Sequence, residues 1–295
     1  MGLVKKFGPV WFIQGTNRGK YPYCNSVYIE GPGIIIDPAS DREELAKIKE
    51  GPGVKEVWLS HWHEDHFMYM DMFEGVPFRL TEIETPPLQD PEVFMDWYGI
   101  EEPLFRDYWR KALVEQFNYR PRTPDTYFQP GETIEAGGLE IDVIHVPGHT
   151  PGSLAFFIKG PDVIFMADYD LGKFGPWYGD RDSDIDHTIE SVNRLREVPA
   201  KVWTTGHEDG LFEQQPGEAW DRYLGVIDQR EAKLMDYITE PRTMDDIVEQ
   251  WIVYRKPREP RGFFEYGERA LMGKHLERLI KKGEVRQVRG AYVKA

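Results

Sequence analysis

Four side chains that can bind a metal ion lie within six residues of the chain. They are His61, His63, Asp65 and His66, and they directly follow an apolar run over 54–59. Because His61 and His63 are two positions apart, their imidazoles leave the same face of an extended chain and can bind one ion. Asp65 and His66 come where the chain is expected to turn into a helix, and they point elsewhere. The motif predicts one metal ion at the histidine pair and leaves ligands for a second.

A solvated, polar helix start is the alternative interpretation, since Asp and His are common at such positions. Three histidines and an aspartate crowded behind a buried strand would, without metal, each need a separate hydrogen-bond partner. Imidazole and carboxylate at this density match a zinc ligand set. We therefore prefer the metal site. Cys24 is the only cysteine, so the site is not thiolate-based.

Further candidate ligands lie at the ends of other predicted strands. His149 stands in a turn with Pro and Gly on both sides, which would present its ring. Asp168 follows a predicted strand at 163–166 and is favoured over its neighbour Asp170. His207 follows another strand. In layered α/β architectures the strand ends face a common edge, so ligands far apart in sequence can meet there.

The elements that must position these residues alternate between short strands and helices. The strands are expected at 10–14, 26–30, 33–36, 54–59, 133–135, 139–146, 154–158, 163–166 and 201–203. The strands at 133–135 and 139–146 are expected to form a hairpin through Gly137-Gly138, and those at 154–158 and 163–166 another through Gly160-Pro161. Helices are expected over 41–50, capped by Asp41, and over 184–196. Between them, an aromatic-rich insert over about 67–128 has spacings that suggest two short helices. It follows the metal motif directly and is well placed to form a lid.

The composition changes after residue 210. Three helices are expected over 222–238, 243–253 and 269–282, and a small hairpin over 284–294. This order is that of a winged helix. Residues 256–295 contain eleven Lys and Arg against five Asp and Glu, in a chain whose net charge is −15. We expect two domains, a catalytic one over 1–220 and a winged-helix-like one over 221–295.

The ordered motifs resemble those of the metallo-β-lactamase superfamily. The matching segments are HWHEDH at 61–66, VPGHTPGS at 146–153, Ala167-Asp168 and Gly206-His207, with Asp37 at the place of an early structural aspartate. The resemblance covers about residues 8 to 212. The remainder resembles the C-terminal winged-helix extension of members similar to β-lactamase-like protein 2.

The resemblance implies an αββα sandwich with two divalent metal ions at one edge, zinc being expected and iron being the alternative. It assigns the ligands position by position. His61, His63 and His149 would hold one ion, Asp65, His66 and His207 the other, and Asp168 would bridge them. A water or hydroxide between the ions would be the nucleophile. Asp65 and Asp168 are thus the implied catalytic residues, Asp65 by orienting the hydroxide or passing on its proton.

The expected activity is hydrolysis of a small ester, thioester or lactone. Aromatic candidates for the substrate pocket, Tyr98, Tyr169, Trp177 and Tyr178, favour an apolar or aromatic acyl group. Residues 169–178 lack the Gly-Arg run associated with glyoxalase II, so glutathione thioesters are not the first choice. The alternatives are a single-strand-specific endoribonuclease or phosphodiesterase, and an iron-dependent oxygen-activating enzyme.

The composition limits the binding partners and the cellular compartment that we expect for the protein. The net charge of −15 argues against a polyanion as the main partner, although the basic C-terminal segment keeps nucleic acid as an alternative. No apolar run is long enough for a signal peptide or a membrane span, so a cytoplasmic protein is expected. A small-molecule substrate and a homodimer are expected.

Overall fold

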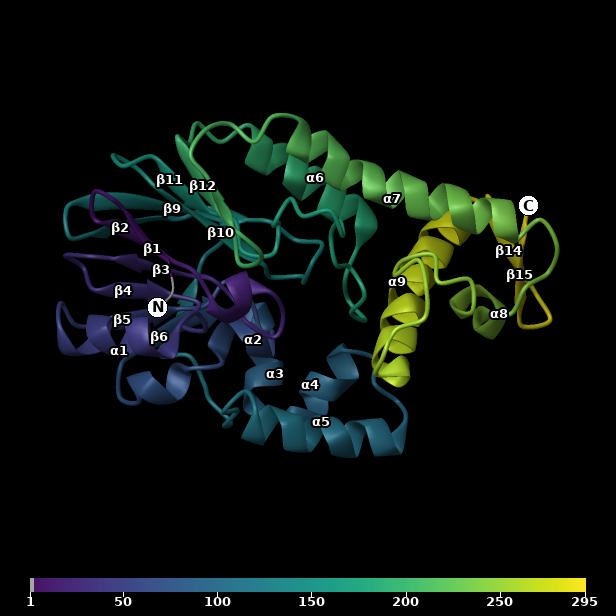
Figure 1. Ribbon diagram of the computed structural model, residues 1–295, viewed down its shortest axis with the longest axis horizontal. Coiled ribbons are helices and arrows are strands. Elements are labelled where there is room, and N and C mark those ends of the chain that lie inside the picture. The colour runs from purple at the N-terminus through teal and green to yellow at the C-terminus, as the bar shows by residue number, and fades with distance from the viewer. Residues whose placement is uncertain (1–2) are drawn as a thin grey trace.

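Two β-sheets pack face to face in the left half of Figure 1, and helices cover the outer face of each sheet. The computed structural model describes residues 3–295. Val27 and Trp58 from the first sheet share one buried core cluster with Val143 and Phe156 from the second. The ring centroids of Trp58 and Phe156 are 5.3 Å apart across this interface. The αββα arrangement expected from the sequence is confirmed.

The first sheet has seven strands in sequential order, antiparallel through β4 and parallel from β4 to β7. Its strands are β1 (Val4–Phe7), β2 (Val10–Ile13), β3 (Ser26–Ile29), β4 (Ile34–Ile36), β5 (Glu56–Trp58), β6 (Phe78–Thr81) and β7 (Thr126–Phe128). Every residue of β3 and β4 is buried, since helices and the second sheet cover both faces.

The second sheet has the order β13-β12-β11-β10-β9-β8, with only β11 and β12 parallel. Its strands are β8 (Thr133–Ala136), β9 (Leu139–His145), β10 (Leu154–Ile158), β11 (Val163–Phe165), β12 (Val202–Thr204) and β13 (Leu211–Phe212). The two hairpins expected from the glycine-containing turns at 137–138 and 160–161 are present.

The helices outside the sheets begin where the sequence indicates. Helix α1 (Arg42–Glu50) is capped by Asp41, whose carboxylate accepts from two backbone N–H groups, and α6 (Ile185–Arg196) is capped by Asp184, whose carboxylate accepts from one. Leu45 packs under the first sheet, and Leu195 packs over the second. Short helices α2 (Glu64–Phe67), η1 (Thr16–Gly19), η2 (Met70–Phe73) and η3 (Glu82–Glu84) complete this part.

The two short helices expected from the aromatic spacing in the insert over 67–128 are present as α4 (Pro91–Trp97) and α5 (Pro103–Glu115), but the insert contains more elements than expected. It also contains the helix α3 (Pro86–Gln89) and two strands, β6 and β7. These strands were missed because each is only three or four residues long and pairs in parallel with a distant segment. Most of the aromatic side chains of the insert form core: Phe94, Trp109 and Phe117 belong to the cluster under the first sheet.

The C-terminal segment forms a lobe at the right of Figure 1. It contains α7 (Glu218–Tyr237), α8 (Met244–Val248), α9 (Arg261–Lys281) and the antiparallel hairpin of β14 (Val285–Val288) and β15 (Ala291–Lys294). The order of elements is the expected one, but α9 begins eight residues earlier than expected and α8 ends five residues earlier.

The expected boundary between residues 220 and 221 lies inside α7. Trp220 and Tyr223 of this helix pack on the second sheet, whereas Ile227 and Leu234 pack within the C-terminal lobe. One continuous helix therefore joins the two parts. No helix among residues 3–295 is both long and apolar enough to cross a membrane.

Candidate metal centre

Three histidine rings converge on one point between the ends of the two sheets. The distances are 3.0 Å from His61 Nε2 to His63 Nδ1, 3.1 Å from His61 Nε2 to His149 Nε2, and 3.0 Å from His63 Nδ1 to His149 Nε2. A tetrahedral zinc ion with Zn–N bonds of about 2.0–2.1 Å separates its nitrogen ligands by roughly 3.4 Å. Burial, followed by repulsion from neighbouring histidines, lowers the pKa of His61, and burial lowers that of His149. Burial also opposes protonation of His63, but the Asp180 carboxylate raises the pKa of this residue to about 9. Three ring nitrogens that face one another this closely fit a shared cation.

A second cluster lies beside the first. His207 Nε2 is 3.3 Å from Asp65 Oδ2 and 3.3 Å from Asp168 Oδ2, and His66 Nε2 is 2.8 Å from Asp168 Oδ1. His66 Nε2 and Asp168 Oδ1 are both buried and neither makes a hydrogen bond, although they lie so close. Buried polar atoms without hydrogen bonds need another partner. Asp65, His66 and His207 would hold a metal ion that supplies this partner, so the residues present fit a second ion.

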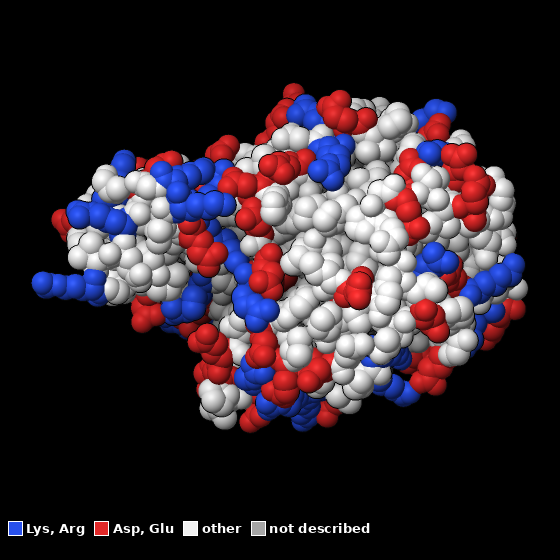
Figure 2. All heavy atoms as spheres, turned by 180° about the vertical axis from the view of Figure 1, so that it is seen from behind, with Lys and Arg blue, Asp and Glu red and all other residues white. Residues whose placement is uncertain are grey.

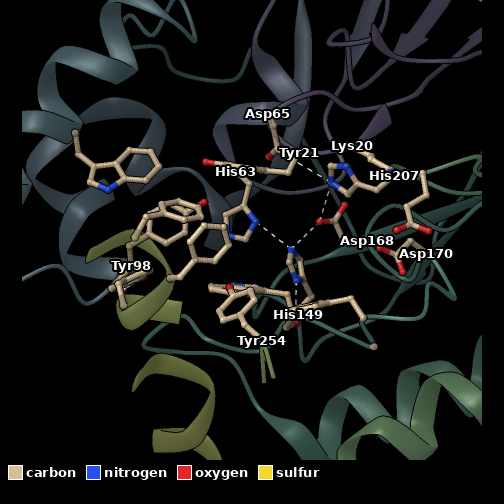
Figure 3. Close-up of a pocket in the computed structure, with 18 residues that line it drawn as sticks. Lys20, Tyr21, His63, Asp65, Tyr98, His149, Asp168, Asp170, His207 and Tyr254 are labelled. Carbon is tan, nitrogen blue, oxygen red and sulfur yellow. Dashed lines mark hydrogen bonds and ion pairs between the residues drawn. The ribbon is translucent and has the colours of Figure 1, made fainter. Parts of the chain in front are cut away.

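Asp168 faces both clusters. Its Oδ2 is 3.3 Å from His149 Nε2, in the first cluster, and 3.3 Å from His207 Nε2, in the second (Figure 3). Burial opposes ionisation of this carboxylate, but the histidines around it, His66 foremost, hold its pKa well below the usual value. Asp168 is therefore a carboxylate that contacts histidines of both clusters. The competing candidate, Asp170, also lines the pocket, but it accepts from the Gly172 N–H and is absent from both His/Asp clusters.

Strand ends deliver these ligands, and two glycines permit their close approach. The 61–66 motif follows β5, Asp168 follows β11, and His207 follows β12. A Cβ atom on Gly206 would lie 2.9 Å from Asp168 Oδ1, and one on Gly148 would lie 2.3 Å from Thr188 N. Only glycine leaves room at these two turns.

The second nitrogen of each histidine ligand faces a fixed acceptor. His149 Nδ1 donates to the Trp177 carbonyl at 3.1 Å, and His207 Nδ1 donates to the Gly19 carbonyl at 2.9 Å. The remaining three pairs are His61 Nδ1 with Ser60 Oγ at 2.9 Å, His63 Nε2 with Asp180 Oδ2 at 2.8 Å, and His66 Nδ1 with Asp37 Oδ2 at 2.8 Å. Such partners fix the tautomer and turn the other nitrogen towards the metal position.

Asp180 was not singled out from the sequence. Its carboxylate accepts from Trp177 Nε1 at 2.9 Å as well as from His63, and it is buried. A single aspartate in an irregular loop has no spacing that marks it. Asp37, in contrast, was expected as a structural residue, and it accepts from the Ser60 backbone N–H and hydroxyl at 2.8 and 2.6 Å.

Two buried glutamates hold the motif in place. Glu84 accepts from the backbone N–H of Trp62 and from that of Gly152, so it joins the 61–66 motif to the turn that carries His149. Glu64 accepts from the hydroxyls of Tyr21 and Tyr98 at 2.8 and 2.7 Å. Burial is the main reason that the pKa of each glutamate rises to about 7.

A cavity of about 450 Å³ opens onto the two clusters. Metal-ligand candidates His63, Asp65, His149, Asp168 and His207 line its floor (Figure 3). Aromatic side chains form the walls. They are Tyr21, Tyr98, Trp109, Phe174, Trp177, Tyr254, Phe263, Phe264 and Tyr266.

The expected pocket residues divide into two pairs. Tyr98 and Trp177 line the cavity. Tyr169 and Tyr178 instead lie in the interior, where the Tyr169 hydroxyl donates to the Val146 carbonyl and the Tyr178 hydroxyl to His275 Nε2. Their assignment to the pocket is corrected, because both side chains are drawn into the packed interior by these buried partners.

The C-terminal lobe supplies pocket residues that the sequence did not reveal. Tyr254, labelled in Figure 3, lines the cavity, and Phe263, Phe264 and Tyr266 line it from the start of α9. The only sequence sign was three aromatic residues within four positions of a basic segment. The lobe therefore closes the pocket over the metal centre.

The family model of the metallo-beta-lactamase superfamily matches residues 20–207, which is more than half of the chain. The chain belongs to this superfamily, as the sequence motifs indicated. The superfamily match and the His/Asp clusters together make it a metal-dependent hydrolase.

Individual relatives and solved structures are similar to this chain over longer segments, in part including the C-terminal lobe. A metallo-beta-lactamase family protein from Thermus thermophilus has a TM-score of 0.75 at 22% identity, over 97% of this chain and 99% of that chain. This likeness shows a shared fold that includes the C-terminal lobe. A hydroxyacylglutathione hydrolase of Hyphomonas neptunium is 24% identical over 78% of this chain and 83% of its own length. The acyl-coenzyme A thioesterase MBLAC2 of Gallus gallus is 24% identical over 64% of this chain.

The chain spans about two thirds of the length of several curated relatives. The alignment covers 66% of the Gallus gallus thioesterase and 64% of a protein from Aquifex aeolicus. The activity of this chain is therefore a matter for proposal and is not taken over from these relatives.

Proposed function

We propose that the protein hydrolyses a thioester, using two divalent metal ions, zinc in the cell. The observation that carries this proposal is the cavity itself, whose floor holds two adjoining ligand clusters and whose walls are aromatic. Such a cavity suits an apolar acyl group next to a polarised carbonyl. The two named relatives differ in the thiol part of their substrates, and a thioester bond is what those substrates share.

The residues that would hold the ions are those of the two clusters, with Asp168 between them. When bound, two ions supply an activated water and polarise the carbonyl oxygen of the substrate. Asp65 lies on the cavity floor, 3.3 Å from His207 Nε2, with Oδ2 towards that ring. We propose that Asp65 accepts a proton from the attacking water and then donates this proton to the leaving sulfur. The C–O bond forms, the C–S bond breaks, and the products are a thiol and a carboxylic acid, which releases its remaining proton to the solvent and leaves as the carboxylate.

The aromatic walls orient the acyl group and exclude water from it. Tyr98 stacks on the ligand His63 with ring centroids 5.1 Å apart, and the Tyr98 hydroxyl is held by Glu64. Tyr266 donates from its hydroxyl to the Tyr98 carbonyl, which joins the insert to the C-terminal lobe. These contacts fix one wall of the pocket beside the reacting carbonyl.

A substrate panel tests the proposal. The full chain, reconstituted with zinc, is assayed against acyl thioesters, aryl esters, lactones and a phosphodiester of matched leaving-group reactivity. We expect the highest kcat/KM on thioesters with apolar acyl groups, and loss of activity on chelation. Cleavage of the phosphodiester alone would overturn the proposal in favour of a nuclease. If the protein purified from its native host contains iron and consumes oxygen, the proposal of hydrolysis is overturned in favour of redox chemistry.

A further inference from the structure

A second cavity adjoins the first. It has a volume of about 290 Å³ and lies between α7 and the segment at 252–258. Phe174 and Tyr254 line both cavities, and their ring centroids are 5.6 Å apart, so the two rings form a shared rim. A molecule seated in the second cavity could cross this rim and reach the metal-ligand floor of the first.

Every charged side chain that lines the second cavity is basic. Its charged lining residues are Lys173, Arg230, Lys233, Arg255 and Arg258, with no Asp or Glu among the lining residues in the described part of the chain. This is unusual in a chain whose net charge is −15. Figure 2 shows from behind that Lys and Arg also gather on the C-terminal lobe, at the left of that view.

These cations are available to a ligand. Within residues 3–295, Lys173, Lys233, Arg255 and Arg258 form no ion pair, whereas most other arginines do. The guanidinium of Arg258 lies 5.7 Å from the ring centroid of Tyr254, which positions it above the rim. Side chains without an acidic partner lose no ion pair when they bind an anion.

Arg230 forms the floor of this cavity and is fixed there. It is only 3% exposed, and its guanidinium donates to the Pro176 and Phe174 carbonyls and to the Tyr178 hydroxyl. All of these partners are uncharged, so its positive charge is not neutralised by them. A nearby acid, Glu268, uses both carboxylate oxygens on the backbone N–H groups of residues 253 and 254.

From these observations we propose that the basic cavity binds the phosphate groups of a coenzyme A thioester, whose acyl end lies over the metal-ligand floor. The inference rests on the proposed thioesterase function. Coenzyme A carries a pyrophosphate and a 3′-phosphate, joined to its sulfur by a long uncharged arm. Arginine and lysine are the side chains that bind phosphate. Glutathione carries no phosphate and would leave the basic cavity without a partner.

Charge reversal in the cavity tests the inference. The variant to be measured is K233E/R258E, which reverses two charges of the basic cavity. Neither of these residues touches the candidate metal ligands. We expect KM for an acyl-coenzyme A to rise at least about tenfold, with kcat little changed. The same acyl group on pantetheine, which lacks the phosphates, should be hydrolysed with kcat/KM unchanged within about twofold. The matched control is K256E, an exposed cation that does not line the cavity.

Binding of 3′,5′-adenosine bisphosphate to the full chain, measured by calorimetry, separates this inference from the proposed function. Binding that is weakened in K233E/R258E and retained in K256E supports the phosphate site, even if no thioester is hydrolysed and the proposed function fails. Absence of binding to the wild-type chain overturns the inference while leaving thioester hydrolysis intact. Equal losses on the coenzyme A and pantetheine substrates, or tighter binding of a single-stranded RNA through the same residues, also overturn it.

Discussion

At the scale of single residues, the candidate site depends on a carboxylate that faces two clusters. Asp168 places one oxygen 2.8 Å from His66 and the other 3.3 Å from both His149 and His207. Asp65, the other carboxylate of the centre, lies near His66 and His207 of the second cluster alone. The arrangement makes Asp168 the residue whose removal should affect both metal positions.

The first prediction concerns this bridge. Asp168→Asn removes one anionic oxygen between the clusters, so we expect one metal equivalent to be lost and kcat/KM to fall at least about a hundredfold. Metal content by mass spectrometry and hydrolysis of the best thioester measure both effects. Asp170→Asn is the matched control and should keep both ions. Full metal content in the Asp168 variant would rule out a bridging role.

The second prediction concerns the partner of His63. Asp180→Asn weakens the hydrogen bond that orients this imidazole, which should lower metal affinity by about 10- to 100-fold. Competition with a chromogenic chelator measures the affinity. Asp182→Asn serves as the control, because Asp182 is exposed and contacts Arg181. Equal affinity in both variants would show that Asp180 does not support the ligand.

Residue types and spacing were sufficient to find the ligand candidates but not their supports. His61, His63 and His149 could be named because imidazoles near strand ends form a pattern. Glu84 and Asp180 are single buried carboxylates whose partners are a backbone N–H or a ring nitrogen far along the chain. Their role depends on tertiary contact, which no local spacing expresses.

At the scale of elements, the site depends on turns that bring strand ends close together. The turn that carries His149 approaches α6 so closely that a Cβ on Gly148 would overlap Thr188. Helix starts and hairpins were predicted well, because their determinants are local: Asp41 caps α1 as expected, and α6 begins next to Asp184, where its periodicity indicated. Strands β6 and β7 were missed because parallel pairing is determined by distant partners.

The third prediction tests this close approach. Gly148→Ala should lower the free energy of unfolding by about 2–4 kcal/mol, because it adds a backbone clash to an unfavourable φ of +126°. Gly160→Ala is the control, with φ +94° and nothing within 4 Å of the new Cβ, and should cost about 1 kcal/mol. Urea denaturation measures both. Equal costs would mean that the clash is relieved by a small shift of α6.

At the scale of the whole molecule, the C-terminal lobe supports the metal centre from outside. Arg230 and His275 bind the loop at 174–178 through the Pro176 carbonyl and the Tyr178 hydroxyl. The same loop accepts the hydrogen bond of His149 through the Trp177 carbonyl. The lobe thus contributes both to the pocket walls and to the position of a ligand. This coupling could not be predicted from the sequence, which indicated a separate domain.

The last prediction concerns the pH dependence of this support. Burial lowers the pKa of His275 below its ordinary value, although Glu231 at 3.3 Å opposes the shift. The unfolded chain therefore takes up a proton on this residue at a higher pH than the folded chain does. Its contribution to stability is complete above the unfolded pKa of about 6.5 and is lost as the pH falls below it.

His275→Asn should therefore destabilise the protein more at pH 7.5 than at pH 5.5, because only the wild-type chain loses the histidine contribution on acidification. Urea denaturation at the two pH values measures the difference between the chains. His187→Asn, at an exposed position on α6, should have little effect at either pH. A larger cost at pH 5.5 would mean that His275 is held protonated by Glu231. The lobe would then be joined to the 174–178 loop by an ion pair instead of by a neutral imidazole.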